Sequence, residues 1–140
     1  MPAIESRLHA ASESFQAHRA GMLALLAEVR SHEARSAAAS NASAERFARR
    51  GQLLPRERLA LLLDTGAPFL PLASLAGLGH DDPDLSKSVP GGGLISGIGQ
   101  VSGVRCMVNA SDSGIDAGAL QPMGLDKQLR VQEIALENNL

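Results

Sequence analysis

Two strand-like runs separated by two residues constrain the fold of this chain more than any other feature. Residues 94–101 and 104–110 are rich in aliphatic side chains, and Ser102 and Gly103 stand between them. A two-residue connection that contains glycine predicts an antiparallel hairpin. Close approach of neighbouring backbone, or β-bulges, is expected at the glycines before and within the first run. These are Gly91, Gly92, Gly93, Gly97 and Gly99.

The longest helical pattern precedes the hairpin and covers residues 6–30, with Ser6 as its expected N-cap. An apolar residue recurs there every seven positions, at Leu8, Phe15, Met22 and Val29. Such a stripe is typical of a helix that packs on its own domain or on a partner subunit. Residues 31–42 are rich in Ser, Ala and Asn, and are compatible with a helix tail or with a loop.

Two short helices are expected next. Ser43 is placed to cap a helix over residues 44–50, which Gly51 ends. Pro55 suits the first turn of a helix over residues 56–63. The apolar side of this third helix is expected to bury Leu59, Leu62 and Leu63, before a turn at Asp64–Gly66.

The remaining pattern predicts a short extended stretch at 68–72, a polar loop at 77–90 and a final helix over 122–138. Leu125, Leu129 and Leu136 share one face of that helix. Helices, a hairpin and a further helix indicate an α/β fold, in which a strand should follow the last helix. The sequence stops at Leu140 before any such strand, so we expect it to be cut at a seam of the fold.

Charge and composition exclude several classes of function. The net charge of −2 gives no basic footprint for nucleic acid. No apolar run is long enough to span a bilayer, and the N-terminus lacks the features of a secretory signal, so cytoplasm is the expected location. The single cysteine, Cys106, fits a reducing compartment and is expected to be a buried structural thiol.

No metal site is expected. The four histidines, His9, His18, His32 and His80, lack the spacing of a helical zinc pair, and no CxxC motif is present. The acidic cluster at 80–84 is expected to be solvated loop charge, with weak cation binding as the alternative. Gly97–Gly103 differs by one position from a dinucleotide fingerprint and lies inside the hairpin, which excludes that function.

A glycine-containing turn before the last helix is the best candidate for a site. Residues 112–119 place backbone N–H groups near a helix start, where such donors can hold an oxyanion or a phosphate. A tight connection between strand and helix is the alternative. Asp112 and Asp116 would repel an anion there.

Three stretches, taken in order and with their spacing, resemble the opening of acyl-CoA carboxylase β subunits. The first is Leu53–Leu59 with Leu62–Leu70, the second is Val89–Gly99 with Val101–Gly103 and Cys106–Val108, and the third is Lys127–Ala135. The resemblance covers roughly residues 45–140. Within the family, the sequence most resembles the methylcrotonyl-CoA and geranyl-CoA carboxylase branch.

The resemblance implies a crotonase-like ββα layer, incomplete in this chain, that follows the N-terminal helices. Residues 1–42 would be a helical extension, and residues 43–140 a truncated N-terminal part of an acyl-CoA carboxyltransferase domain. The implied reaction moves a carboxyl group from carboxybiotin to an acyl-CoA enolate. The expected substrate is a branched acyl-CoA or an enoyl-CoA. Biotin would be carried on a biotin carboxylase or biotin carrier subunit, and the carboxyltransferase subunits would form a homo-oligomer.

The same resemblance places the backbone amides of Ala117, Gly118 and Ala119 beside the acyl-CoA. No complete catalytic set is expected within the chain, so the isolated 140 residues should be inactive. Asp116 and Ala117 stand where methylcrotonyl-type enzymes carry Lys and Gly. Leu120 in place of Tyr supports the hypothesis of a longer acyl chain. The alternative function is a non-catalytic helical interaction module or an inactive remnant, which the heptad stripe favours.

Overall fold

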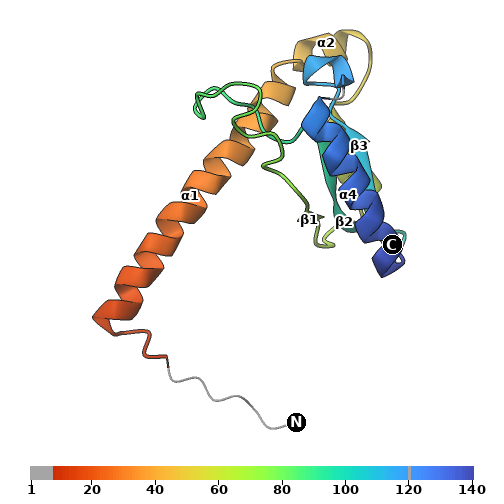
Figure 1. Cartoon of the computed structure of the whole chain (residues 1–140). Coiled ribbons are helices and arrows are strands. Elements are labelled where there is room, and N and C mark those ends of the chain that lie inside the picture. Colours follow the sequence, from red (N-terminus) through yellow and green to blue (C-terminus); the bar gives the residue numbers. More distant parts are fainter. Residues whose placement is uncertain (1–7, 120) are drawn as a thin grey trace. The chain divides into compact units, whose positions relative to one another are not determined.

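The predicted hairpin forms the larger part of a three-stranded antiparallel sheet (Figure 1). The structure is a computed structural model that describes residues 8–119 and 121–140. β2 (Leu94–Val101) pairs with β3 (Val104–Ser111) in unbroken register, which confirms the two predicted strands. β1 (Leu70–Pro71) adds a short edge opposite Gly97 and Ile98. The expected glycine contacts are therefore close approaches of backbone and not bulges.

The hairpin turn is held from outside the sheet. Ser102 and Gly103 both have positive φ, +53° and +78°, as a two-residue turn that follows strand twist requires. Asp64, the first residue of the predicted turn after the third helix, accepts hydrogen bonds from both backbone N–H groups, each at 2.7 Å. The predicted turn at Asp64–Gly66 thus also fixes the tip of the hairpin.

The chain divides into two compact units, residues 1–31 and residues 32–140. α1 (Glu13–Asn41) includes the segment at 31–42 that sequence left open, and this segment is helical as far as Asn41. The expected cap Ser6 lies outside the described residues. In the first unit, Met22 and Val29 of the heptad stripe are 57% and 37% exposed, so the stripe does not pack within that unit.

The short helices follow their predicted bounds closely, but two side chains do not behave as expected. α2 (Ala44–Arg49) ends just before Gly51, which has positive φ, yet the Ser43 hydroxyl donates to the carbonyl of Gly114 and does not cap the helix. α3 (Pro55–Leu62) begins at the predicted proline. Leu62 is 50% exposed, whereas Leu59 and Leu63 line a cavity.

The last helix, α4 (Pro122–Asn138), packs along β2 and β3 (Figure 1). Its buried positions are Gly124, Lys127 and Val131. The leucine face at Leu125, Leu129 and Leu136 is exposed. The physical reason is a close backbone approach, since a Cβ added at Gly92 would lie only 2.7 Å from the Cα of Gly124.

Apart from prolines, five apolar side chains are buried in the described part of the chain: Phe47, Leu94, Ile95, Val108 and Val131. Cys106 is only half-buried, which corrects the expectation of a buried thiol. Its neighbours Val104 and Arg105 are exposed, so this end of β3 is only partly covered. No helix among residues 8–119 and 121–140 is long and apolar enough to cross a membrane.

The contact between Gly92 and Gly124 generates a stability prediction with a matched control. Gly51 and Gly92 have nearly the same φ, +62° and +61°, but a Cβ at Gly51 would meet nothing within 4 Å. Gly51→Ala should therefore cost only the left-handed backbone conformation, about 1 kcal/mol. Gly92→Ala should cost a further 1–3 kcal/mol, roughly, from overpacking.

Urea denaturation of both variants and of the unmodified protein measures this difference. Equal losses of unfolding free energy in the two variants would show that Gly124 of α4 does not pack closely against Gly92.

Candidate functional site

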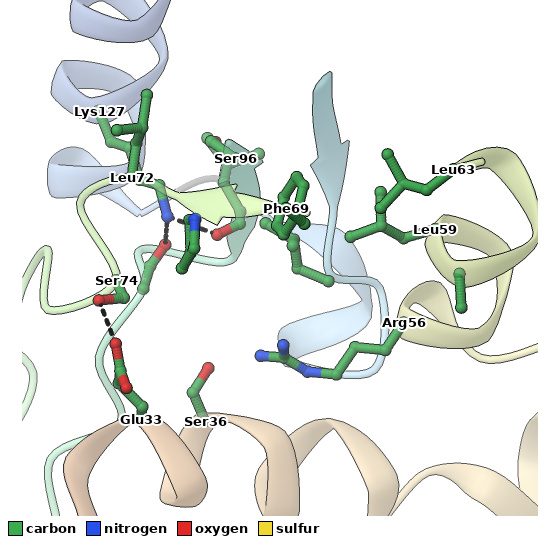
Figure 2. A pocket seen from close by; sticks show the side chains of 15 residues that line it. Glu33, Ser36, Arg56, Leu59, Leu63, Phe69, Leu72, Ser74, Ser96 and Lys127 are labelled. Carbon is green, nitrogen blue, oxygen red and sulfur yellow. Dashed lines mark hydrogen bonds between the residues drawn. The ribbon is translucent and has the colours of Figure 1, made fainter. Parts of the chain in front are cut away.

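One cavity of about 400 Å³ lies among α3, β2 and α4 (Figure 2). Leu59, Leu63 and Phe69 contribute apolar walls. The guanidinium of Arg56 points into the space in Figure 2, and its Nε is buried without a hydrogen-bond partner among the described residues. Glu33 accepts a hydrogen bond of 2.7 Å from Ser74. The cavity is mostly apolar, with one guanidinium that is not fully satisfied.

Lys127 lines the same cavity but holds backbone in place. Its Nζ donates to the carbonyls of Leu94 at 2.7 Å and Gly91 at 3.2 Å. Burial, with a smaller contribution from the positive charge of Arg56, lowers the pKa of Lys127 to about 8. Two of its three N–H groups are thus committed to the turn that precedes β2.

A second cavity, of about 610 Å³, has a different character. We call it the arginine pocket, and its lining consists of Arg46, Phe47, Arg50, Gly51, Gln52, Leu53, Arg58, Ser113 and Ala117. Three guanidinium groups and no carboxylate belong to this lining. Arg46 is fixed by hydrogen bonds of 3.1 Å to the Ser43 hydroxyl and to the Ser113 carbonyl. Arg50 and Arg58 form no ion pair with any residue in the described ranges.

The predicted turn lies at the edge of this pocket. Asp116–Gly118 form a short 3₁₀ turn, η1, in which all three residues have positive φ. The N–H groups of Gly118 and Ala119 donate to carbonyls of the turn, at 2.9 and 3.0 Å. The N–H of Ala117 has no partner among the described residues, and Ala117 alone of the three predicted positions lines the arginine pocket.

The two carboxylates that were expected to repel an anion are both turned to other partners. Asp116 is exposed, and its Oδ2 accepts a hydrogen bond of 3.2 Å from Gln121. Asp112 is buried and accepts a hydrogen bond of 2.6 Å from the hydroxyl of Ser40. Neither residue belongs to the lining of the arginine pocket.

The acidic loop uses its carboxylates internally. Burial opposes ionisation of Asp81, but hydrogen bonds from Ser88 and from the N–H of Val89 outweigh it and lower the pKa of Asp81. Asp84 accepts hydrogen bonds from the backbone and the hydroxyl of Ser86. No group of three or more potential metal ligands gathers in the described part of the chain.

The chemistry that the arginine pocket supports is recognition of a multiply charged anion. Guanidinium groups bind phosphate and carboxylate oxygens with paired donors, and a free backbone N–H adds one directed donor. Ala117 was predicted from the sequence, whereas Arg46, Arg50 and Arg58 were not. The available signal was density, because five of the thirteen residues from 46 to 58 are arginines.

Comparison with known proteins identifies the family. The model of the carboxyl transferase domain matches residues 46–140, and the chain therefore belongs to this family. The mixed helix and sheet fold agrees, because it superposes on the crystal structure of the geranyl-CoA carboxylase β subunit of P. aeruginosa with a TM-score of 0.88. That match has 50% sequence identity and covers 99% of this chain and 26% of the other.

The relatives point to one branch of the family. The chain is 45% identical, over 83% of its length, to the biotin-dependent 3-methylcrotonyl-CoA carboxylase β1 subunit of Mycobacterium tuberculosis. It is 47% identical, over 65% of its length, to the mitochondrial methylcrotonoyl-CoA carboxylase β chain of Dictyostelium discoideum. The chain spans only 21% and 15% of the lengths of these two relatives.

The lowered pKa of Lys127 predicts a pH dependence of stability. The folded-state pKa of about 8 lies below the ordinary value of 10.5, so the unfolded chain binds more protons between these two pH values. Stability should therefore rise from pH 8 to pH 10.5, by at most about 3 kcal/mol. Urea titrations at several pH values measure this rise.

The chain offers a clean control, because Lys87 is its only other lysine and it has no tyrosine. Lys127→Met should flatten the rise, whereas Lys87→Met, at an exposed position, should keep it. A rise in stability that persists in Lys127→Met would contradict the lowered pKa of Lys127 as its cause.

Proposed function

We propose that this chain provides acyl-CoA-binding structure to the carboxyltransferase β subunit of a biotin-dependent acyl-CoA carboxylase of the methylcrotonyl-CoA and geranyl-CoA branch. The observation that carries the proposal is the arginine pocket, which brings three guanidinium groups and the free N–H of Ala117 together within a carboxyl transferase domain. The alternative of a non-catalytic helical module has no comparable support, because its evidence was the heptad stripe alone.

The charge of the pocket suits the nucleotide end of coenzyme A. Coenzyme A carries a pyrophosphate and a further phosphate, and each presents oxygens that guanidinium groups bind in pairs. Arg50 and Arg58 are exposed and have no ion-pair partner among the described residues, so they are available to a ligand. Arg46 is already anchored to Ser113 and supplies a fixed positive wall.

Ala117 gives the pocket its directed donor. Its N–H lies in a turn that is closed by the hydrogen bonds of the Gly118 and Ala119 N–H groups, so the position of this donor is set before any ligand binds. A preorganised N–H stabilises a developing negative charge without reorganisation. Within the proposal, Ala117 contacts an acceptor oxygen of the bound acyl-CoA, and Gly118 and Ala119 hold the shape of the turn.

The proposed reaction is transfer of a carboxyl group from carboxybiotin to the enolate of an acyl-CoA. Biotin would arrive on a biotin carrier subunit, and no residue described here is assigned to hold it. β2, β3 and α4 would form one ββα unit of a crotonase-like layer, within a homo-oligomer of carboxyltransferase subunits. The part of this chain in the reaction is to bind and orient the thioester.

The identity of the acyl group is a narrower proposal. Leu120, which supports a longer acyl chain, lies outside the described residues, so the preference for a geranyl-type thioester rests on sequence. Carboxylation assays of the whole enzyme with geranyl-CoA and methylcrotonyl-CoA test it, and preference for the shorter thioester would overturn it. The cytoplasmic location stays a prediction, since the Dictyostelium relative is named as mitochondrial.

Binding of coenzyme A to the 140-residue chain tests the proposed site. Arg50→Gln and Arg58→Gln should each weaken the affinity about tenfold, as loss of a charge-assisted contact of roughly 1.5 kcal/mol implies. Pantetheine, which has no phosphate, should bind more weakly than coenzyme A and should be insensitive to both substitutions. Isothermal titration calorimetry at low salt measures these affinities.

Arg49→Gln is the matched control, because Arg49 belongs to the same helix but pairs with Glu45 at 3.8 Å and does not line the pocket. Absence of binding, or an equal loss in the Arg49 variant, would count against the arginine pocket.

A further inference from the structure

Asp112 is the most deeply buried ionisable side chain near the candidate site, and its contacts reach several elements. It follows β3 directly and is 1% exposed. Oδ1 accepts a hydrogen bond of 2.6 Å from the hydroxyl of Ser40 in α1, and a second of 3.3 Å from the N–H of Gly114. Oδ2 lies 4.0 Å from the guanidinium of Arg56 in α3 and has no hydrogen-bond partner among the described residues.

The backbone of Asp112 is fixed as well. Its N–H donates to the carbonyl of Gly93 at 2.8 Å, and its carbonyl accepts from the N–H of Ile115 at 2.9 Å. Ile115 in turn accepts from the N–H of Gly118, also at 2.9 Å. A continuous chain of hydrogen bonds therefore runs from Asp112 through Ile115 into the turn that carries Ala117.

The loop between Asp112 and the turn is also gripped from the helical side. The hydroxyl of Ser43 donates to the carbonyl of Gly114 at 2.8 Å, and Arg46 donates to the carbonyl of Ser113 at 3.1 Å. Gly114 lies so close to α1 that a Cβ there would be 2.7 Å from the backbone oxygen of Ser40. Arg46 is shared, because it also lines the arginine pocket.

A buried carboxylate with one oxygen unsatisfied costs stability, and an apolar residue of similar volume would avoid that cost. A purely structural link between strand and helix does not need it. The loop that Asp112 shapes leads into η1, where the N–H groups of Asp116 and Ala117 have no hydrogen-bond partner among the described residues and only Ala117 lines the arginine pocket. The free-energy cost of burying the Asp112 carboxylate has a purpose if the direction of the Ala117 N–H determines how tightly a ligand binds.

We propose that Asp112 is a positioning residue for the acyl-CoA site, which sets the direction of the Ala117 N–H through Gly114 and Ile115 and is itself oriented by Ser40 and Arg56. This inference rests on the proposed function, because it assigns Asp112 to the same pocket. Asp112 does not line the pocket and acts only through the loop. Its removal should therefore alter how the turn engages a ligand while the arginine end continues to bind.

The test is a titration of the 140-residue chain with coenzyme A, followed by ¹⁵N–¹H NMR and calorimetry. In the unmodified protein, coenzyme A should shift the amide resonances of Ala117 at the turn and of Gly51 at the arginine end. Asp112→Asn should keep the shift at Gly51, lose the shift at Ala117, and weaken the affinity about tenfold, which corresponds to roughly 1.4 kcal/mol of binding free energy.

Asp116→Asn is the matched control, because it removes one negative charge from the same loop at an exposed position. Loss of negative charge by itself favours anion binding, so Asp116→Asn should bind coenzyme A at least as tightly as the unmodified protein. A weaker affinity in Asp112→Asn therefore has the opposite sign to a charge effect. Equal affinity and an unchanged Ala117 shift in Asp112→Asn would overturn the positioning role.

Ser40→Ala is a milder variant that removes only the hydroxyl donor to Asp112, and it decides the matter if Asp112→Asn does not fold. It should reduce the Ala117 shift and weaken the affinity about threefold. A folded Ser40→Ala protein that matches the unmodified one in both measurements would overturn the proposal. If the unmodified chain binds no coenzyme A, the proposed function itself fails, and the positioning role fails with it.

Discussion

The glycine turn before β2 is the constraint on which the rest of the structure depends, because three separate elements are attached to it. Gly92 allows α4 to approach at Gly124, where any side chain would collide with backbone. The carbonyl of Gly91 accepts from Lys127, and the carbonyl of Gly93 accepts from the N–H of Asp112. The sheet, the last helix and the loop that carries the candidate site are thereby held in one arrangement.

That arrangement separates two kinds of positive charge. Lys127 is buried and spends its donors on backbone carbonyls, and its lowered pKa reflects this burial. Arg50 and Arg58 remain exposed in the pocket that Ala117 also lines, so their charge is available to a ligand. Function at this site therefore follows from where the fold leaves a charge unpaired, and not from the number of basic residues.

Sequence predicted the strands, the hairpin turn and the bounds of α4, because these depend on local patterns. It failed where long-range contacts decide. Leu62 was expected to be buried but is 50% exposed, and the Ser43 hydroxyl donates to the carbonyl of Gly114 instead of capping its own helix. Ala117 was found through family resemblance, whereas the role of Asp112 depends on Ser40, which lies 72 positions earlier and shows no local signal.

A crystal structure of the chain with bound coenzyme A tests the central claim most directly. The account predicts phosphate oxygens within roughly 3 Å of the guanidinium groups of Arg50 or Arg58, together with a ligand oxygen at the N–H of Ala117. Coenzyme A bound in the apolar cavity beside Phe69, or with its phosphates away from these arginines, would contradict the account.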